Sequence, residues 1–243
     1  MNDGTLLLAR AEISRLRRNR RYLLMTLALP IILYLVIGAQ VTTVVDGLPF
    51  AAYYMIGMAA FGSFSGALMN NSVRIAQERK EGWIRQLRLT PLPARGYVVA
   101  KLLASMAISI PSVVIVLLLG HFVGHVHMAA SAWILVAIVV WLGALTFAAL
   151  AVAIGYRFQP DQVQPLATLI YFIFIVLGGV FFPLGSTLEK IGKFTPTYEA
   201  VTISISLAKS QPVDGLMIVG LVIWLAVFVS LAALSVRATA EAV

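Results

Sequence analysis

Six apolar runs, each close to the length that an α-helix needs to cross a bilayer, dominate the sequence. They cover residues 22–44, 50–72, 97–120, 132–155, 164–183 and 213–236. A spanning helix needs roughly 20 mainly apolar residues. Apolar residues make up 60% of the chain and charged residues 12%, against about 45–50% and 25% in soluble domains. We therefore predict an all-α polytopic membrane protein with six transmembrane helices. It forms a single domain over residues 1–243, with no room for a soluble catalytic domain.

The basic residues are distributed unevenly between the two sides of these runs. With a cytoplasmic N-terminus, the inside carries six in the N-terminal arm, seven from Arg74 to Lys101, and Arg157 and Arg237, against Lys190, Lys193 and Lys209 outside. The positive-inside rule then predicts both termini in the cytoplasm, and we expect a prokaryotic plasma-membrane protein. Because the charges flank spans, orientation and anionic lipid explain the net charge of +8 better than nucleic acid does.

The N-terminal arm, residues 3–20, combines a narrow apolar stripe with several arginines. Leu6, Ala9, Ile13 and Leu16 recur at helical spacing, which is typical of an interfacial helix on an anionic leaflet. A disordered basic leader is the alternative. A cleaved signal peptide is disfavoured, because no small-residue cleavage site follows the apolar run.

A polar stretch at residues 77–92 concentrates charge between the second and third runs. Its acidic residues come first and its basic residues last, which suits the dipole of a short helix. Gly82 is costly inside a helix and marks the boundary between two helices, and Pro91 pushes Thr90 out of the α region. The apolar residues between them share one face: Trp83, Ile84 and Leu87. We predict a short amphipathic helix at 83–89 that lies under the bundle.

The segment at residues 186–209, before the last run, contains two short amphipathic pieces separated by Thr195 and Pro196. Each piece is too short to span a bilayer. The segment could enter the outer leaflet and return, which is allowed where irregular backbone packs against protein. The alternative is an ordinary external loop with a surface helix.

The stretch Glu78-Arg79-Lys80-Glu81-Gly82-Trp83-Ile84-Arg85-Gln86-Leu87-Arg88-Leu89-Thr90-Pro91-Leu92 resembles the Glu-Arg-x-x-Gly…Leu…Thr/Ser-Pro-Leu stretch of type-two ABC exporter permeases. Gly179 to Pro183, followed by Thr195 to Tyr198, is similar to their last external segment. The resemblance implies an interfacial helix, six spans, a coupling helix at 83–89 and re-entrant helices at 186–209.

The resemblance also implies partners. The family's permeases pair with a second copy or a close paralogue, and two copies of a separate ABC ATPase subunit bind beneath them. The implied coupling residues are Glu78, Arg79, Gly82, Trp83, Leu87, Thr90 and Pro91, although Trp83 replaces a residue that is usually small or β-branched.

The sequence contains no Gly-x-x-x-x-Gly-Lys-Ser/Thr phosphate loop. We therefore expect that this chain is not itself an enzyme and binds no cofactor, and that ATP and Mg²⁺ belong to the partner subunit. We expect no metal site either, because His121, His125 and His127 have no carboxylate or thiol nearby in sequence to complete a ligand shell.

Two groups of residues are candidates for a substrate path. Gly62 and Gly66 form a small-residue face in the second run, for which close helix packing is the other interpretation. Tyr171, Phe174 and Phe181 could line an amphiphile path, or could face lipid as part of an aromatic belt.

The predicted function is export of a hydrophobic or amphipathic compound, such as a drug, an antibiotic or a lipid, which would connect the chain with multidrug efflux and antibiotic resistance. Polysaccharide or lipid-linked glycan export uses the same family architecture and is the alternative cargo. A secondary transporter or a membrane scaffold is a further alternative. No ionisable residue falls in the middle of a predicted run, which disfavours ion-driven transport.

Overall fold

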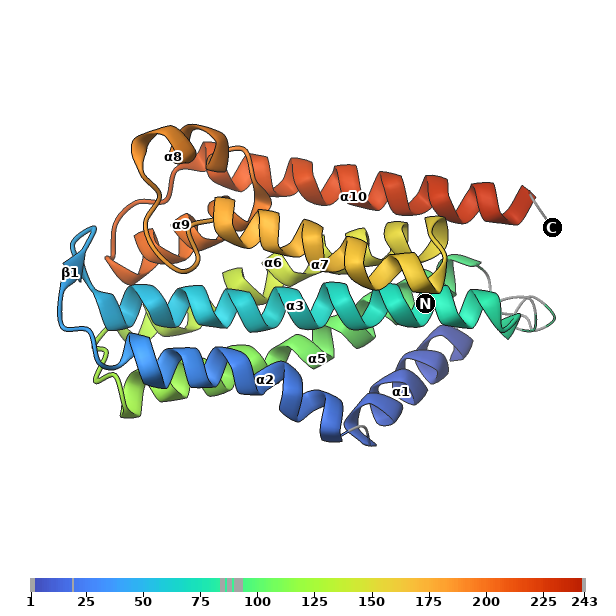
Figure 1. Cartoon of the computed structure of the whole chain (residues 1–243), viewed down its shortest axis with the longest axis horizontal. Coiled ribbons are helices and arrows are strands. Elements are labelled where there is room, and N and C mark those ends of the chain that lie inside the picture. Colours follow the sequence, from blue (N-terminus) through green and yellow to red (C-terminus); the bar gives the residue numbers. More distant parts are fainter. Residues whose placement is uncertain (1–2, 19, 84–85, 87–88, 90–93, 242–243) are drawn as a thin grey trace.

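The computed structural model describes residues 3–18, 20–83, 86, 89 and 94–241. The described part is mainly helical, and its long helices run side by side along one elongated bundle (Figure 1). These are α2 (Arg20–Leu33), α3 (Phe50–Lys80), α5 (Ala94–Phe122), α6 (Ala130–Arg157), α7 (Pro160–Leu177) and α10 (Gly215–Glu241). The other helical elements are α1 (Asp3–Arg18), the π-helix η1 (Tyr34–Gly38), which directly follows α2, and the short helices α8 (Ser186–Gly192) and α9 (Pro196–Ala208).

Four helices among the described residues are long and apolar enough to cross a membrane. They cover Gly96–Phe122, Ala130–Arg157, Pro160–Leu177 and Gly215–Ala238. The first predicted run contributes only a shorter apolar helix, Thr26–Gly38. The second lies in α3, which is long but carries glycine, serine, tyrosine and asparagine. All of residues 50–64 in α3 are buried, and helices that pack against other helices in a membrane bundle often carry small and polar residues at their contacts. The count of six spans stays a prediction.

The first predicted run, 22–44, extends past the end of its helix. Beyond Gly38 the chain forms a small antiparallel hairpin of β1 (Val44–Val45) and β2 (Leu48–Pro49). Asp46 and Gly47 between the strands have positive φ angles of 51° and 74°, as the tight turns of two-residue hairpins require. The Asp-Gly pair is a strong hairpin signal, which a search for apolar runs overlooks. The prediction of a purely helical fold is therefore wrong at this corner.

Two other predicted boundaries also differ from the structure. α3 continues past residue 72 to Lys80, so the polar start of the 77–92 stretch belongs to the same helix. The fifth run, predicted at 164–183, is a helix at Pro160–Leu177. Proline is favoured in the first turn of a helix, and Gly179 takes a φ of 64°, which helices use to end.

The segment predicted as re-entrant contains α8 and α9. The Thr195 hydroxyl accepts a hydrogen bond from the Tyr198 backbone N–H at 3.3 Å, which caps α9. Thr197, Ala200 and Ser204 of α9 are fully buried, and α9 packs against α3, α6, α7 and α10. α9 is therefore packed into the bundle, whereas Leu188 and Ile191 of α8 are exposed. The re-entrant interpretation of the segment stays a prediction.

The N-terminal arm forms α1, a helix rather than a disordered leader. Its buried face contains Thr5, Ala9 and Glu12, whereas Leu6 is 38% exposed. The face that packs against α5 therefore overlaps the predicted stripe at Ala9 and Ile13 but leaves Leu6 out, and it includes a carboxylate. A buried carboxylate is stable only with hydrogen-bond or charge partners.

The candidate functional site at the junction of α1, α3 and α5

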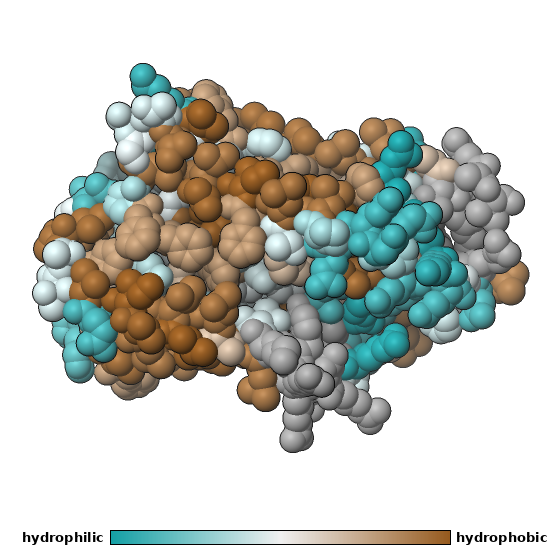
Figure 2. All heavy atoms as spheres, viewed as in Figure 1, coloured by the Kyte–Doolittle hydropathy of each residue, from teal (hydrophilic) through white to brown (hydrophobic). Residues whose placement is uncertain are grey.

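Three helices meet near the end of the bundle at which α3, α6 and α10 terminate, where α1 slants towards α3 (Figure 1). We call it the arginine-rich end, because Arg79, Arg157 and Arg237 lie in or beside the last turns of these helices. Polar residues gather at the same end, while brown apolar residues cover much of the rest of the visible face (Figure 2). We call the buried cluster between the three helices the junction; its members are Glu12, Arg74, Glu78, Tyr97 and Lys101.

Lys101 is the centre of the junction. Its side chain is 0% exposed, and its Nζ lies 2.7 Å from Glu78 Oε1 and 2.9 Å from Glu12 Oε1. The Nη2 of Arg74 lies 2.6 Å from Glu12 Oε2 and 3.5 Å from Glu78 Oε1. The Tyr97 hydroxyl donates to Glu78 Oε2 at 2.6 Å. Two cations and two carboxylates therefore share a compact, neutral network that links α1, α3 and α5.

The burial of these charges makes the junction rigid. Taking each ion out of water costs several kcal/mol, and this cost is offset only while the partners and hydrogen bonds stay in place. Separation of α1 from α3 and α5 would leave Glu12 without its cations. The Asn71 amide extends the contact along the same helices, since it donates to the Lys101 backbone carbonyl at 3.1 Å and to the Ser105 hydroxyl.

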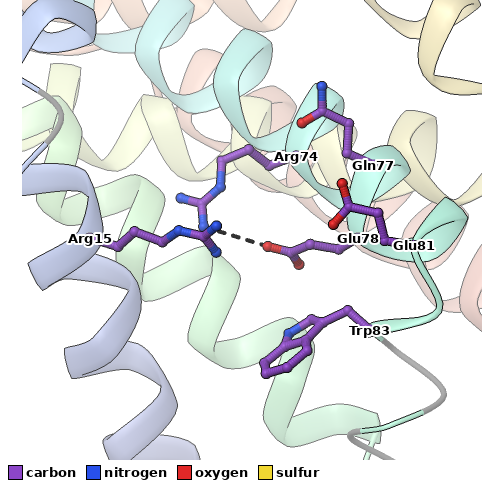
Figure 3. A pocket seen from close by; sticks show the side chains of 6 residues that line it. All are labelled: Arg15, Arg74, Gln77, Glu78, Glu81 and Trp83. Carbon is purple, nitrogen blue, oxygen red and sulfur yellow. Dashed lines mark hydrogen bonds and ion pairs between the residues drawn. The ribbon is translucent and has the colours of Figure 1, made fainter.

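A polar pocket of about 370 Å³ opens beside the junction (Figure 3). Its lining residues come from α1, from the last turns of α3 and from the chain that follows: Arg15, Arg74, Gln77, Glu78, Glu81 and Trp83. Figure 3 shows the α3 side chains on one side, Arg15 on α1 opposite them, and the Trp83 indole below the pocket. Trp83 is 41% exposed. A large aromatic side chain at the surface beside a polar pocket is suited to contact another protein.

The end of α3 places Trp83 at this position. Gly82 has a φ of 76°, a conformation that only glycine adopts at low cost. A Cβ at residue 82 would meet no atom within 4 Å, so the backbone angle rather than space favours glycine here. The helix end predicted near Gly82 is confirmed by the end of α3 at Lys80, while a second helix that starts there stays a prediction. Arg79 fixes this end to α6, since it donates to the Phe158 carbonyl at 2.5 Å.

The profile of a family described as "ABC-2 type transporter" matches residues 4–206 of the chain. The chain belongs to this family. It is also 28% identical over 192 residues, 77% of its own length and 78% of the relative's, to a Bacillus subtilis (strain 168) protein named "Putative transport permease YvfS". The recognition of a type-two ABC permease from the 78–92 stretch is thereby confirmed, and every residue of the junction lies inside the matched region.

The ABC-2 coupling candidates separate into two groups in the structure. Glu78 is buried inside the junction, whereas Trp83 lies at the surface. Leu87, Thr90 and Pro91 lie outside the described residues, as does most of the predicted coupling helix at 83–89. The part that these residues play in coupling stays a prediction.

The aromatic candidates for a substrate path pack between helices of the ABC-2 bundle. The Tyr171 hydroxyl donates to the Phe61 carbonyl at 2.6 Å, and the Tyr171 and Phe181 rings lie 5.4 Å and 5.6 Å from the Phe61 ring. The Phe174 ring contacts Trp224 of α10 at 5.9 Å. Tyr171 and Phe181 therefore pack against α3, and Phe174 packs against α10. The role of these three residues in a substrate path stays a prediction.

Gly62 and Gly66 have different surroundings although both lie on α3. A Cβ on Gly62 would overlap the Ser112 hydroxyl of α5 and lie 3.0 Å from Pro30 of α2, whereas a Cβ on Gly66 would meet only methyl groups at 3.7 Å. Gly62→Ala is therefore expected to destabilise the protein by about 1–3 kcal/mol through overpacking. Gly66→Ala should be neutral or stabilise α3 by up to about 1 kcal/mol, because alanine favours helix. Melting temperatures of both variants in detergent would test the difference; equal values would indicate open space beside Gly62.

Sequence reasoning missed most of the ABC-2 junction. Lys101 was predicted only as a charge at the edge of a run, and Glu12 was not singled out. The only signal for Glu12 was its position three residues after Ala9 and seven after Thr5. This spacing places all three residues on one helix face. The sequence also gave no sign that Glu199 of α9 would be buried, at 6% exposure.

Among the described residues, no group of three histidine, cysteine, aspartate or glutamate side chains could hold a metal ion. His121 instead contacts aromatic rings, with the Trp133 ring at 5.7 Å.

Proposed function

We propose that this chain is the membrane-spanning subunit of an ATP-driven exporter that moves a hydrophobic or amphipathic compound, such as a drug, an antibiotic or a lipid. In this proposal two copies of a separate ABC ATPase bind at the arginine-rich end and hold the ATP and Mg²⁺. A second permease copy, identical or a close paralogue, completes the transport path. Each permease crosses the plasma membrane six times and has both termini in the cytoplasm.

The junction is the observation that carries this proposal. A force applied at the pocket acts on the last turns of α3, which line it. Buried ion pairs then connect α3 to its neighbours, since Glu78 pairs with Lys101 of α5 and Arg74 pairs with Glu12 of α1. Because the pairs resist separation, the three helices would move together when an ATPase subunit changes shape. The absence of a phosphate loop from the sequence agrees with hydrolysis on another chain.

The distribution of charge supports an apolar or amphipathic cargo. In α5, α6, α7 and α10 the charged residues of the candidate spans lie near the helix ends: Lys101, Arg157, Asp161 and Arg237. A path between such helices offers few fixed charges to a strongly ionic cargo. Polysaccharide or lipid-linked glycan export is the alternative, because its lipid part would meet the same surfaces.

The test is coexpression of the tagged permease with the ABC ATPase subunits encoded near its gene, followed by purification in mild detergent. We expect one ATPase subunit per permease chain, and hydrolysis of Mg·ATP by the complex. A permease that purifies without any ATPase subunit would overturn the proposal. Cargo movement that follows an imposed pH gradient without ATP would instead identify a secondary transporter, and a scaffold would give neither result.

A further inference from the structure

An apolar groove of about 450 Å³ lies between α5, α6 and α10, near the arginine-rich end. Its lining residues are mostly valine and alanine, with one cation: Val98, Val99, Leu102, Ala149, Val152, Val229, Ala232, Ala233, Val236 and Arg237. The volume falls within the range of about 300–1,000 Å³ that is usual for small-molecule sites. The groove plays no part in the junction or in its pocket.

Small side chains create the groove. Ala149 on α6 and Ala232 on α10 are buried where these helices pack, and Ala233 adds little bulk beside them. The outer face of α10 carries large exposed apolar side chains instead, such as Leu231 at 44% and Leu234 at 61% exposure. An apolar hollow in a lipid-facing helix surface fits an acyl chain, because water gains no hydrogen bonds there.

The length of the groove fits one leaflet. Val229 and Arg237 are eight residues apart on α10, or roughly 12 Å at the rise of an α-helix. Half of the hydrocarbon core is about 15 Å thick. A transmembrane helix of a second permease would be expected to contact α10 along a longer stretch, so the dimensions favour a lipid tail.

Arg237 supplies charge complementarity at the mouth of the groove. It is exposed, and the ion pairs found among the described residues do not include it. It lies at the end of α10 where lipid headgroups would be. An arginine binds phosphate oxygens through two parallel N–H groups. A zwitterionic headgroup also has a phosphate, but its ammonium group opposes the attraction to a cation, so this position favours an anionic headgroup.

We propose that the groove binds an anionic phospholipid, with an acyl chain between α5, α6 and α10 and the headgroup phosphate on Arg237. The site lies in the leaflet at the arginine-rich end. It requires no ATPase subunit, so its test is independent of the exporter proposal.

The experiment measures lipid that the permease retains. The protein is reconstituted in nanodiscs of equal parts phosphatidylglycerol and phosphatidylcholine, extracted in mild detergent, and analysed by lipid mass spectrometry. We expect retained phosphatidylglycerol to exceed phosphatidylcholine in the wild type. Arg237→Gln should lower this preference about fivefold, the factor expected for one cation at the membrane surface. Arg237→Lys should keep most of it. Glu241→Gln removes the acidic residue nearest in sequence and should not lower it.

A second pair of variants tests the apolar part of the site. Ala233→Trp fills the groove and should reduce retention of both lipids, whereas Leu234→Trp places the same side chain outside the groove lining and should not. Equal retention by these two variants would overturn the proposal. So would a preference for phosphatidylglycerol that Arg237→Gln leaves unchanged, or a preference that inorganic phosphate abolishes.

Discussion

Replacement of Lys101 by methionine is expected to cost about 3–5 kcal/mol of folding free energy, because it leaves two buried carboxylates with one cation between them. Lys101 is 0% exposed and contacts both Glu12 and Glu78. In Lys101→Met these carboxylates would share only Arg74, whose contact with Glu78 is the longest of the four at 3.5 Å. The measurement is the melting temperature of the purified permease. We expect it to fall further in Lys101→Met than in Gly62→Ala or Trp83→Ala.

Two further variants show whether charge is the cause. Lys80→Met removes a lysine from the exposed end of α3 and should leave the melting temperature almost unchanged. Adding Glu78→Gln to Lys101→Met leaves one carboxylate instead of two beside Arg74. The double variant should therefore regain part of the lost melting temperature. A Lys101→Met protein as stable as Lys80→Met would show that the junction contributes little to the fold.

The sequence could predict the helices but not the junction, and the reason is the distance along the chain between its members. Lys101 lies 89 residues from Glu12 and 23 from Glu78. Apolar runs and helix breakers are local signals, so α5, α6 and the end of α3 before Gly82 follow from them. A buried ion pair depends on two helices meeting, and until they meet each charge looks solvent-exposed.

The errors at α3 and at the hairpin have a related cause. A search for apolar runs ends the second run at residue 72, where the chain turns polar, although a helix can continue through polar residues, as α3 does to Lys80. The first run was extended through Val41 to Val44 because valine is apolar in any structure. The Asp46-Gly47 turn shows that these valines lead into a hairpin.

Trp83→Ala is expected to weaken binding of the ATPase subunit by about 2 kcal/mol, or about thirtyfold, without lowering the melting temperature of the permease. Tryptophan is the residue type most often found at energetic hot spots of interfaces. Trp83 is 41% exposed beside the polar pocket, so its removal creates no cavity in the bundle. The Kd of the ATPase subunit for the permease in nanodiscs is the measurement.

Phe194→Ala is the matched control, because Phe194 is 76% exposed and lies between α8 and α9, away from the pocket residues. Its loss should leave the Kd unchanged. The contrast with Lys101→Met would separate two predicted roles at one end of the molecule, in which the junction holds the helices together and Trp83 contacts the partner. An unchanged Kd in Trp83→Ala would remove Trp83 from the interface, and a fall in its melting temperature as large as that of Lys101→Met would make it part of the fold.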